Sequence, residues 1–125
     1  MTPRAIIAAD VRVGDVWRGK GATGQLVKVA NITRNPWECD KVEWQGVGRR
    51  TSGRCDLGPF PQRRTLHERG GVRIGDVRAM GKASTTKVLV LRDDVAVCDD
   101  ADGIRTYPAA EIAALPLVSR DGKAV

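Results

Sequence analysis

The sequence predicts an all-β protein made of two tandem five-stranded small barrels, with a short helical turn near the C-terminus. Three observations lead to this prediction: a repeated hexapeptide, a series of short strand-like segments, and glycine- and proline-rich turns between them. The hexapeptide Val11 to Val16 (VRVGDV) returns as Val72 to Val77 (VRIGDV) with one change. A module of about 60 residues buries only roughly 60% of its unfolded surface, so we expect the two modules to dock or the chain to dimerise.

The first module, residues 1–69, reads as short strands separated by turn residues. Strands are predicted, in order, over Val11–Trp17, with Gly14-Asp15 as a bulge, and over Gln25–Ile32, Lys41–Gln45, Arg49–Leu57 and Gln62–Glu68. Gly19 to Gly24 is expected to be a flexible loop. Pro36 ends the second strand because proline cannot donate a hydrogen bond to a sheet. Gly70-Gly71 is interpreted as a linker.

The second module, residues 72–118, follows the same plan. Strands are expected over Val72–Met80, Lys87–Arg92 and Val95–Val97, from Gly103 onward, and at Leu117-Val118. The strand from Lys87 is apolar on both faces, so both faces are expected to be covered. Gly103 to Thr106 matches Gly48 to Thr51 in three of four places, which supports a duplication. Pro108 to Leu115 (PAAEIAAL) predicts one or two helical turns with proline at the start, and residues 119–125 a frayed tail.

The excess of positive charge lies entirely in the first module. Residues 1–69 hold 13 Lys and Arg against 7 Asp and Glu, whereas residues 70–125 hold 8 of each. The large aromatic side chains follow the same division: Trp17, Trp37, Trp44 and Phe60 all lie in the first module. We therefore expect the first module to bind the ligand and the second to act as a scaffold or docking surface, through which a homodimer would form.

On strand spacing and the R-(V/I)-G-D-V motif, the chain resembles tandem small β-barrels of the Src-homology-3-like type, the Tudor and KOW class, over nearly its whole length. The arginine-rich composition, 15 Arg against 6 Lys, resembles that of a GC-rich actinobacterium or one of its phages. The resemblance implies a nucleic-acid or peptide adaptor. A fold alone does not imply a function.

Basic side chains of the first module are the candidate phosphate ligands, because arginine presents a planar fork to phosphate. The candidates are Arg18, Lys20, Lys28, Arg49, Arg50, Arg54, Arg63 and Arg64. If strands four and five are neighbours, these residues form one stripe. For any single arginine, ordinary solvated charge is the alternative, and only the clustering favours binding.

Trp17 and Trp37 are the candidate stacking residues beside this stripe. Trp17 aligns with Arg78 of the second copy, and a position that holds arginine in one copy is expected to be exposed in both. Trp37 lies in a loop without a counterpart. The alternatives are that Trp17 covers a barrel end and that Trp37 anchors its own loop. Trp44 aligns with Val97 and is expected in the core; an aromatic cage with Phe60 is a more distant alternative.

Other classes of function lack the required residue patterns. Cys39, Cys55, Cys98 and His67 lack the C-x2-C spacing of a zinc site, so no metal or cofactor is expected. No catalytic arrangement is evident, the Gly19 to Gly24 loop lacks the phosphate-loop pattern, and an enzyme is not expected. No apolar run approaches the ~18 residues of a membrane span. Three cysteines fit a reducing cytoplasm.

These observations favour a non-enzymatic nucleic-acid-binding protein whose first barrel contacts the phosphate backbone. DNA is the favoured ligand, and RNA stays open. The alternative is a protein-interaction adaptor or phage accessory factor that binds a host or virion protein. Binding that weakens steeply with salt would favour the first hypothesis.

Overall fold

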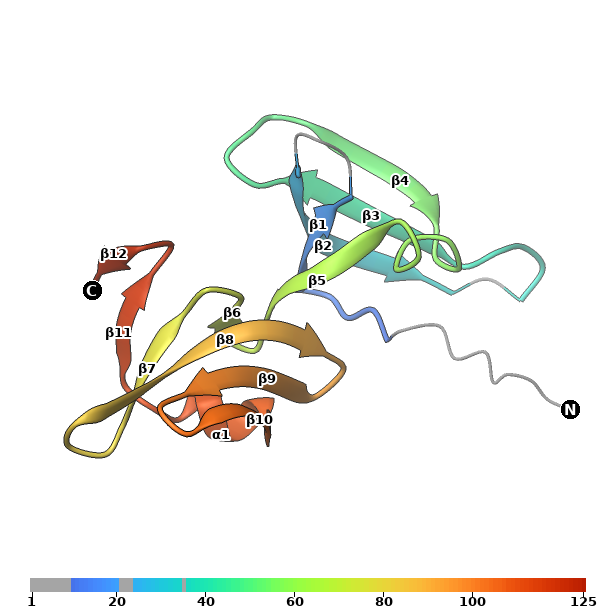
Figure 1. Ribbon diagram of the computed structural model, residues 1–125. Coiled ribbons are helices and arrows are strands. Elements are labelled where there is room, and N and C mark those ends of the chain that lie inside the picture. Colours follow the sequence, from blue (N-terminus) through green and yellow to red (C-terminus); the bar gives the residue numbers. More distant parts are fainter. Residues whose placement is uncertain (1–9, 21–23, 35) are drawn as a thin grey trace, which may run out of the picture. The chain divides into compact units, whose positions relative to one another are not determined.

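The computed structural model describes residues 10–20, 24–34 and 36–125. The chain divides into two compact units between Leu66 and His67. The all-β prediction is confirmed: two six-stranded antiparallel sheets are accompanied by one short helix (Figure 1). None of the described helices is long and apolar enough to cross a membrane. Residues 21–23 of the predicted glycine loop lie outside the described residues.

The first sheet has the order β4-β3-β2-β1-β5-β6. Its strands are β1 (Val16–Gly19), β2 (Leu26–Thr33), β3 (Lys41–Gly46), β4 (Ser52–Asp56), β5 (Arg64–Arg69) and β6 (Val72–Arg73). Strands β1 to β4 form a meander, and β5 returns to pair with β1. Val27, Val29, Val42 and Phe60 are buried in the core of this unit. The expected linker Gly70-Gly71 is instead the tight turn between β5 and β6, and both glycines have positive φ.

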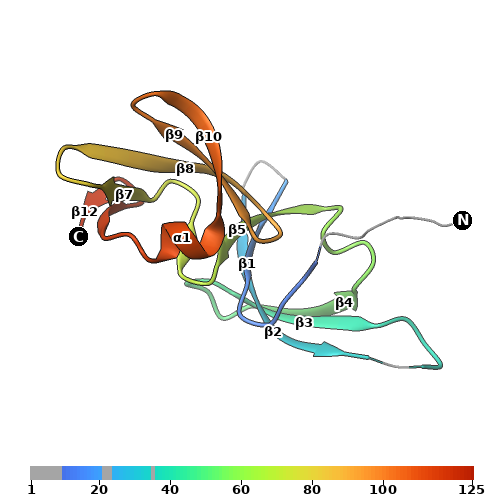
Figure 2. The same cartoon turned by 90° about the horizontal axis from the view of Figure 1, so that it is seen from below.

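The second sheet has the order β10-β9-β8-β7-β11-β12, so its first five strands repeat the connectivity of the first sheet (Figure 2). Its elements are β7 (Val77–Met80), β8 (Ser84–Arg92), β9 (Val95–Asp100), β10 (Gly103–Pro108), α1 (Ala109–Ala113), β11 (Leu117–Arg120) and β12 (Lys123–Ala124). The predicted helical turn is confirmed as α1, which directly follows Pro108 and buries Ile112. The predicted frayed tail is wrong, because β12 pairs with β11 as a hairpin.

The repeated hexapeptide makes the same hydrogen bonds in both units. The Gly14 N–H donates to the Val29 carbonyl over 2.9 Å, and the Gly75 N–H donates to the Val88 carbonyl over 2.8 Å. The aspartate that follows each glycine accepts a backbone N–H from three residues earlier: Asp15 from Arg12 and Asp76 from Arg73. The Gly-Asp pair therefore builds a turn before β1 and before β7, not a bulge within a strand, and the glycine is needed because φ is +94° and +92°.

Residues Trp17 and Arg78 occupy equivalent positions, and both are buried. Their exposed fractions are 3% and 5%, so the expectation that this position is exposed is wrong. Each side chain donates an N–H over 3.2 Å to the buried aspartate two residues earlier, Trp17 to Asp15 and Arg78 to Asp76. The aspartate makes either side chain acceptable in the core because a buried N–H donor needs an acceptor.

Strand pairing corrects the alignment of the two copies by one residue. Val29 pairs with Trp44 and the equivalent Val88 pairs with Cys98, so Trp44 matches Cys98 and not Val97. Trp44 is half-buried, with its ring against Gly53, rather than fully in the core. Both β2 and β8 carry a register shift directly after the paired valine, so the two units share this irregularity.

Two further expectations for the second copy are wrong. Trp44 pairs with Gly53 of β4, and the equivalent Cys98 pairs with Arg105 of β10. β10 therefore matches β4, and the expected match of Gly103 to Thr106 with the turn of Gly48 to Thr51 is wrong. The outer face of β8 is also uncovered, because the register shift turns Val90 toward solvent, where it is 45% exposed.

A buried ion cluster surrounds Asp76 in the second unit. Its carboxylate accepts hydrogen bonds from Arg78 and, through two nitrogens, from Arg120. Arg78 also donates to the carbonyls of Ala113 and Leu115 at the end of α1. One guanidinium group therefore joins the hexapeptide, α1 and the carboxylate.

Acid should destabilise the protein through Asp76. Burial alone would raise the pKa of Asp76, but the hydrogen bonds from two guanidinium groups and one backbone N–H lower it below the usual value. A carboxyl group whose folded pKa is depressed stabilises the fold above its unfolded pKa of about 3.9, and that contribution is lost as the pH falls through the folded pKa. Urea unfolding between pH 2 and 6 should show this loss below about pH 4, and Asp76→Asn should flatten the dependence. An unchanged profile in the variant would contradict this prediction.

Candidate nucleic-acid interface

A basic hollow of about 290 Å³ opens where β4 and β5 approach each other in the first unit. It is lined by Gly19, Lys20, Cys55, Pro59, Phe60, Arg63 and Arg64. In the sheet order β4 and β5 are separated by three strands, so the sheet must curl for Cys55 of β4 and Arg64 of β5 to line one hollow. We call these seven residues the basic hollow.

Three cationic side chains surround the basic hollow, and its lining contains no carboxylate. The Lys20 ammonium donates to the Gln62 carbonyl over 3.0 Å, which fixes it on the turn before β5. The Arg64 guanidinium lies 4.4 Å from the centre of the Phe60 ring, so its position is set by a cation–π contact. Arg63 is exposed at the rim. Three positive charges around a small hollow suit an anion with several acceptor oxygens, such as a phosphate group.

The second unit has a hollow of about 450 Å³ at the equivalent place, but its lining is not basic. Met80 and Gly81 replace Gly19 and Lys20, as the shared register of β1 and β7 shows. Phe60 and Ile112 are both buried, and in each unit the carbonyl of this residue accepts a hydrogen bond from the N–H three residues later, that of Arg63 or Leu115. Leu115 therefore replaces Arg63. The two units therefore each have a hollow at this place, and the two hollows differ in charge.

The hollow of the second unit contains a carboxylate with its own partners. Asp100 accepts hydrogen bonds from the hydroxyl groups of Thr86 and Tyr107. Both bonds lower the pKa of Asp100. The bond to Asp100 raises the pKa of Tyr107. Asp102 also lines this hollow, whereas Arg105 is its one basic residue. An anion would therefore meet repulsion here that it would not meet in the first unit.

The remaining predicted phosphate ligands do not line the basic hollow. Arg18, Lys28 and Arg54 are exposed residues of β1, β2 and β4, and Arg49 and Arg50 lie in the turn between β3 and β4. Arg54 pairs across the strands with Glu43 and lines a separate hollow of about 510 Å³. The single stripe was predicted on the premise that strands four and five are neighbours. In the order of the described strands, β4 and β5 are not neighbours, so this premise is wrong.

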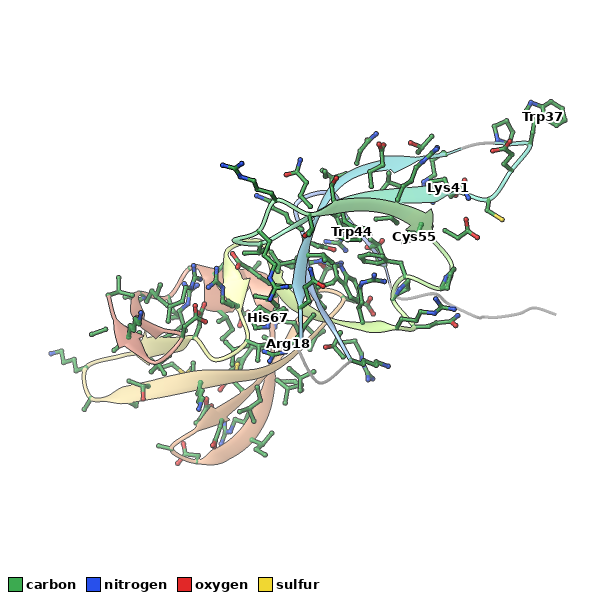
Figure 3. The ribbon with its side chains drawn as sticks, turned by 90° about the horizontal axis from the view of Figure 1, so that it is seen from above. Arg18, Trp37, Lys41, Trp44, Cys55 and His67 are labelled. Carbon is green, nitrogen blue, oxygen red and sulfur yellow. The ribbon has the colours of Figure 1, made fainter. Side chains whose placement is uncertain are left out.

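The two predicted stacking residues have opposite surroundings. Trp17 is in the core, where its ring meets Phe60 edge-on with 5.7 Å between centroids. Trp37 is 90% exposed and projects from the loop between β2 and β3, well apart from the labelled Arg18 and Cys55 (Figure 3). In the second unit the corresponding connection is the two-residue turn Asp93-Asp94.

Sequence reasoning did not assign Cys55 and Phe60 to the site. They carry no positive charge, so the pattern of basic residues does not mark them, although both lie within nine residues of Arg64 in the sequence. Among the residues that the structure describes, no group of three His, Cys, Asp or Glu side chains is placed to hold a metal ion. Neither a protein-family model, nor a curated protein, nor a solved structure matches this chain.

The three thiols should report the charge of their surroundings through alkylation. Cys39 is exposed, Cys55 is half-buried and Cys98 is buried, and burial raises the pKa of Cys98. We expect reaction with neutral iodoacetamide in the order Cys39, Cys55, Cys98. The anionic reagent iodoacetate should favour Cys55 relative to Cys39, because the cations of the basic hollow attract it. Peptide mass spectrometry gives the rates, and equal reagent preference at Cys39 and Cys55 would contradict the prediction.

Proposed function

We propose that each unit is a small barrel of the Src-homology-3-like type, in the Tudor and KOW class. Two observations support this. Both units have the same five-strand order, in which the fifth strand returns to pair with the first. In addition, Cys55 of β4 and Arg64 of β5 line one hollow, although three strands separate β4 from β5 in the sheet order. Curling of this kind leads to a barrel.

We propose that the protein is a non-enzymatic nucleic-acid-binding protein and that its first unit contacts the phosphate backbone at the basic hollow. The observation that carries this proposal is the comparison of the two hollows. Lys20 and Arg63 stand where the second unit has Gly81 and Leu115. Because the two units share one strand order, the second hollow serves as an internal comparison for the first. The first hollow differs from it in carrying positive charge suited to phosphate. The other basic residues supply flanking contacts.

A salt series tests this function. Affinity for a fluorescein-labelled 20-base-pair DNA of mixed sequence would be measured by anisotropy between 0.05 and 0.5 M NaCl. Three phosphate contacts give a slope of log K against log salt of about −2.7, and flanking contacts make it steeper. Binding that does not change with salt, or absence of binding at 0.05 M, would overturn the proposal.

A second candidate function is protein–protein interaction through the second unit. The observation in its favour is a set of exposed apolar side chains on β8 to β10, where Val90, Val95 and Ile104 are 45%, 41% and 69% exposed. Capture of a protein from lysate that survives nuclease and is lost in Val90→Lys/Ile104→Lys would support this function. Capture that nuclease abolishes would favour the nucleic-acid proposal.

A further inference from the structure

We infer that the ligand of the basic hollow is double-stranded nucleic acid, bound through phosphates without base stacking. This inference rests on the proposed function and specifies its ligand. Proteins that bind single strands combine a basic groove with exposed aromatic rings on which bases stack. The first unit has the basic side chains, but the aromatic rings beside them are buried and pack against each other.

The aromatic rings near the basic hollow have no free face to offer a base. Phe60 is 1% exposed and Trp17 is 3% exposed, and the two rings pack against each other. The Arg64 guanidinium also lies on the Phe60 ring, so one of the two flat faces of the guanidinium is covered. Its N–H groups lie in the plane of the guanidinium and donate at its edge, which is how arginine meets phosphate oxygens.

The exposed ring of Trp37 lies elsewhere in the same unit. Figure 3 places it at the far end of the loop between β2 and β3, away from Arg18 and Cys55. The other exposed cations lie on β1, β2, β4 and in the turn between β3 and β4: Arg18, Lys28, Arg49, Arg50 and Arg54. Cations spread over four such elements match the wide backbone surface of a duplex better than the narrow track of one strand.

Charge density then favours the duplex. Duplex DNA carries one charge per about 1.7 Å of its axis, and each neutralised phosphate contributes a salt slope of about 0.9, against about 0.7 for a single strand. For three contacts, and equal affinity at 1 M salt, this difference gives about 4-fold tighter duplex binding at 0.1 M. Because no base is read, the sequence of the duplex should matter little.

The test compares matched probes on the full chain at 0.1 M NaCl. The probes are a 20-base-pair DNA duplex, its separate single strand, and the RNA duplex and strand of the same sequence. Each is measured by anisotropy with the wild type and with Trp37→Ala. We expect each duplex to bind at least about 4-fold more tightly than its strand, and Trp37→Ala to change neither affinity by more than about 2-fold. A preference for only one of the two duplexes would identify the natural source of the backbone and still support the inference.

Three outcomes would overturn the inference. A single strand that binds as tightly as its duplex would show that the charge argument fails. A loss of roughly 5-fold or more in single-strand affinity in Trp37→Ala would show that a base stacks there. In either of these cases the proposed nucleic-acid function survives. Absence of binding to all four probes would overturn the function as well, so the two failures are distinguishable.

Discussion

Replacing Asp76 by alanine is expected to lower the free energy of unfolding by about 3–5 kcal/mol, because the change removes the partner of a buried guanidinium. Arg78 is 5% exposed and would lose its hydrogen bond to this carboxylate, while Arg120 would lose both of its bonds to the same group. A loss of this size is a large share of the stability of a small domain. Urea unfolding followed by far-UV circular dichroism measures it.

Two variants separate the buried charge from simple loss of packing. Asp15→Ala removes the equivalent aspartate of the first unit, where the uncharged Trp17 stands in place of Arg78. Because the change leaves no guanidinium unpaired at that position, a smaller loss of roughly 1–3 kcal/mol is expected. Asp76→Ala combined with Arg78→Leu removes both members of the pair and should recover part of the stability lost in Asp76→Ala. Equal losses at Asp15 and Asp76, or no recovery in the double variant, would refute the interpretation.

Removing the three cations of the basic hollow is expected to abolish most of the affinity for duplex DNA. In Lys20→Gln/Arg63→Gln/Arg64→Gln the slope of log K against log salt should become shallower by about 2.7. If the affinities converge at 1 M salt, this change corresponds to roughly 500-fold weaker binding at 0.1 M. The measurement is the anisotropy salt series, with far-UV circular dichroism to verify that the variant is folded.

A matched control removes the same number of charges from the second unit. Lys82, Lys87 and Arg92 are exposed there, and their replacement by Gln lowers the net charge equally. We expect this control to change the salt slope by less than about one unit, since these residues do not lie at the basic hollow. Similar losses in both triple variants would mean that net charge, and not the basic hollow, determines binding.

Much of the fold could be predicted from local patterns. Short alternating segments with glycine and proline between them predicted most of the strands, and the hexapeptide predicted that the two halves share a structure. The hydrogen bonds of Gly14 and Gly75 give the physical reason why the hexapeptide persists: each glycine adopts a positive φ that other residues rarely adopt, and each aspartate holds the turn.

What the sequence did not predict depends on which side chains are buried in the folded protein and on one contact between distant segments. An arginine at position 78 indicated an exposed site, yet the buried carboxylate of Asp76 makes that arginine a core residue and makes Trp17 one too. The aspartate two residues before both side chains was the available signal. The basic hollow was not predicted because Lys20 reaches the turn before β5, 42 residues away in the sequence, only in the folded protein.

The most direct test of the central claim is a footprint of the basic hollow by alkylation of Cys55. The full chain would be treated with iodoacetamide with and without a saturating DNA duplex, and the rates at Cys55 and at the exposed Cys39 would be compared by peptide mass spectrometry. If phosphate occupies the basic hollow, Cys55 should react several-fold more slowly with the duplex bound, while Cys39 keeps its rate. An unchanged rate at Cys55 under conditions where the duplex is fully bound would show that binding takes place elsewhere.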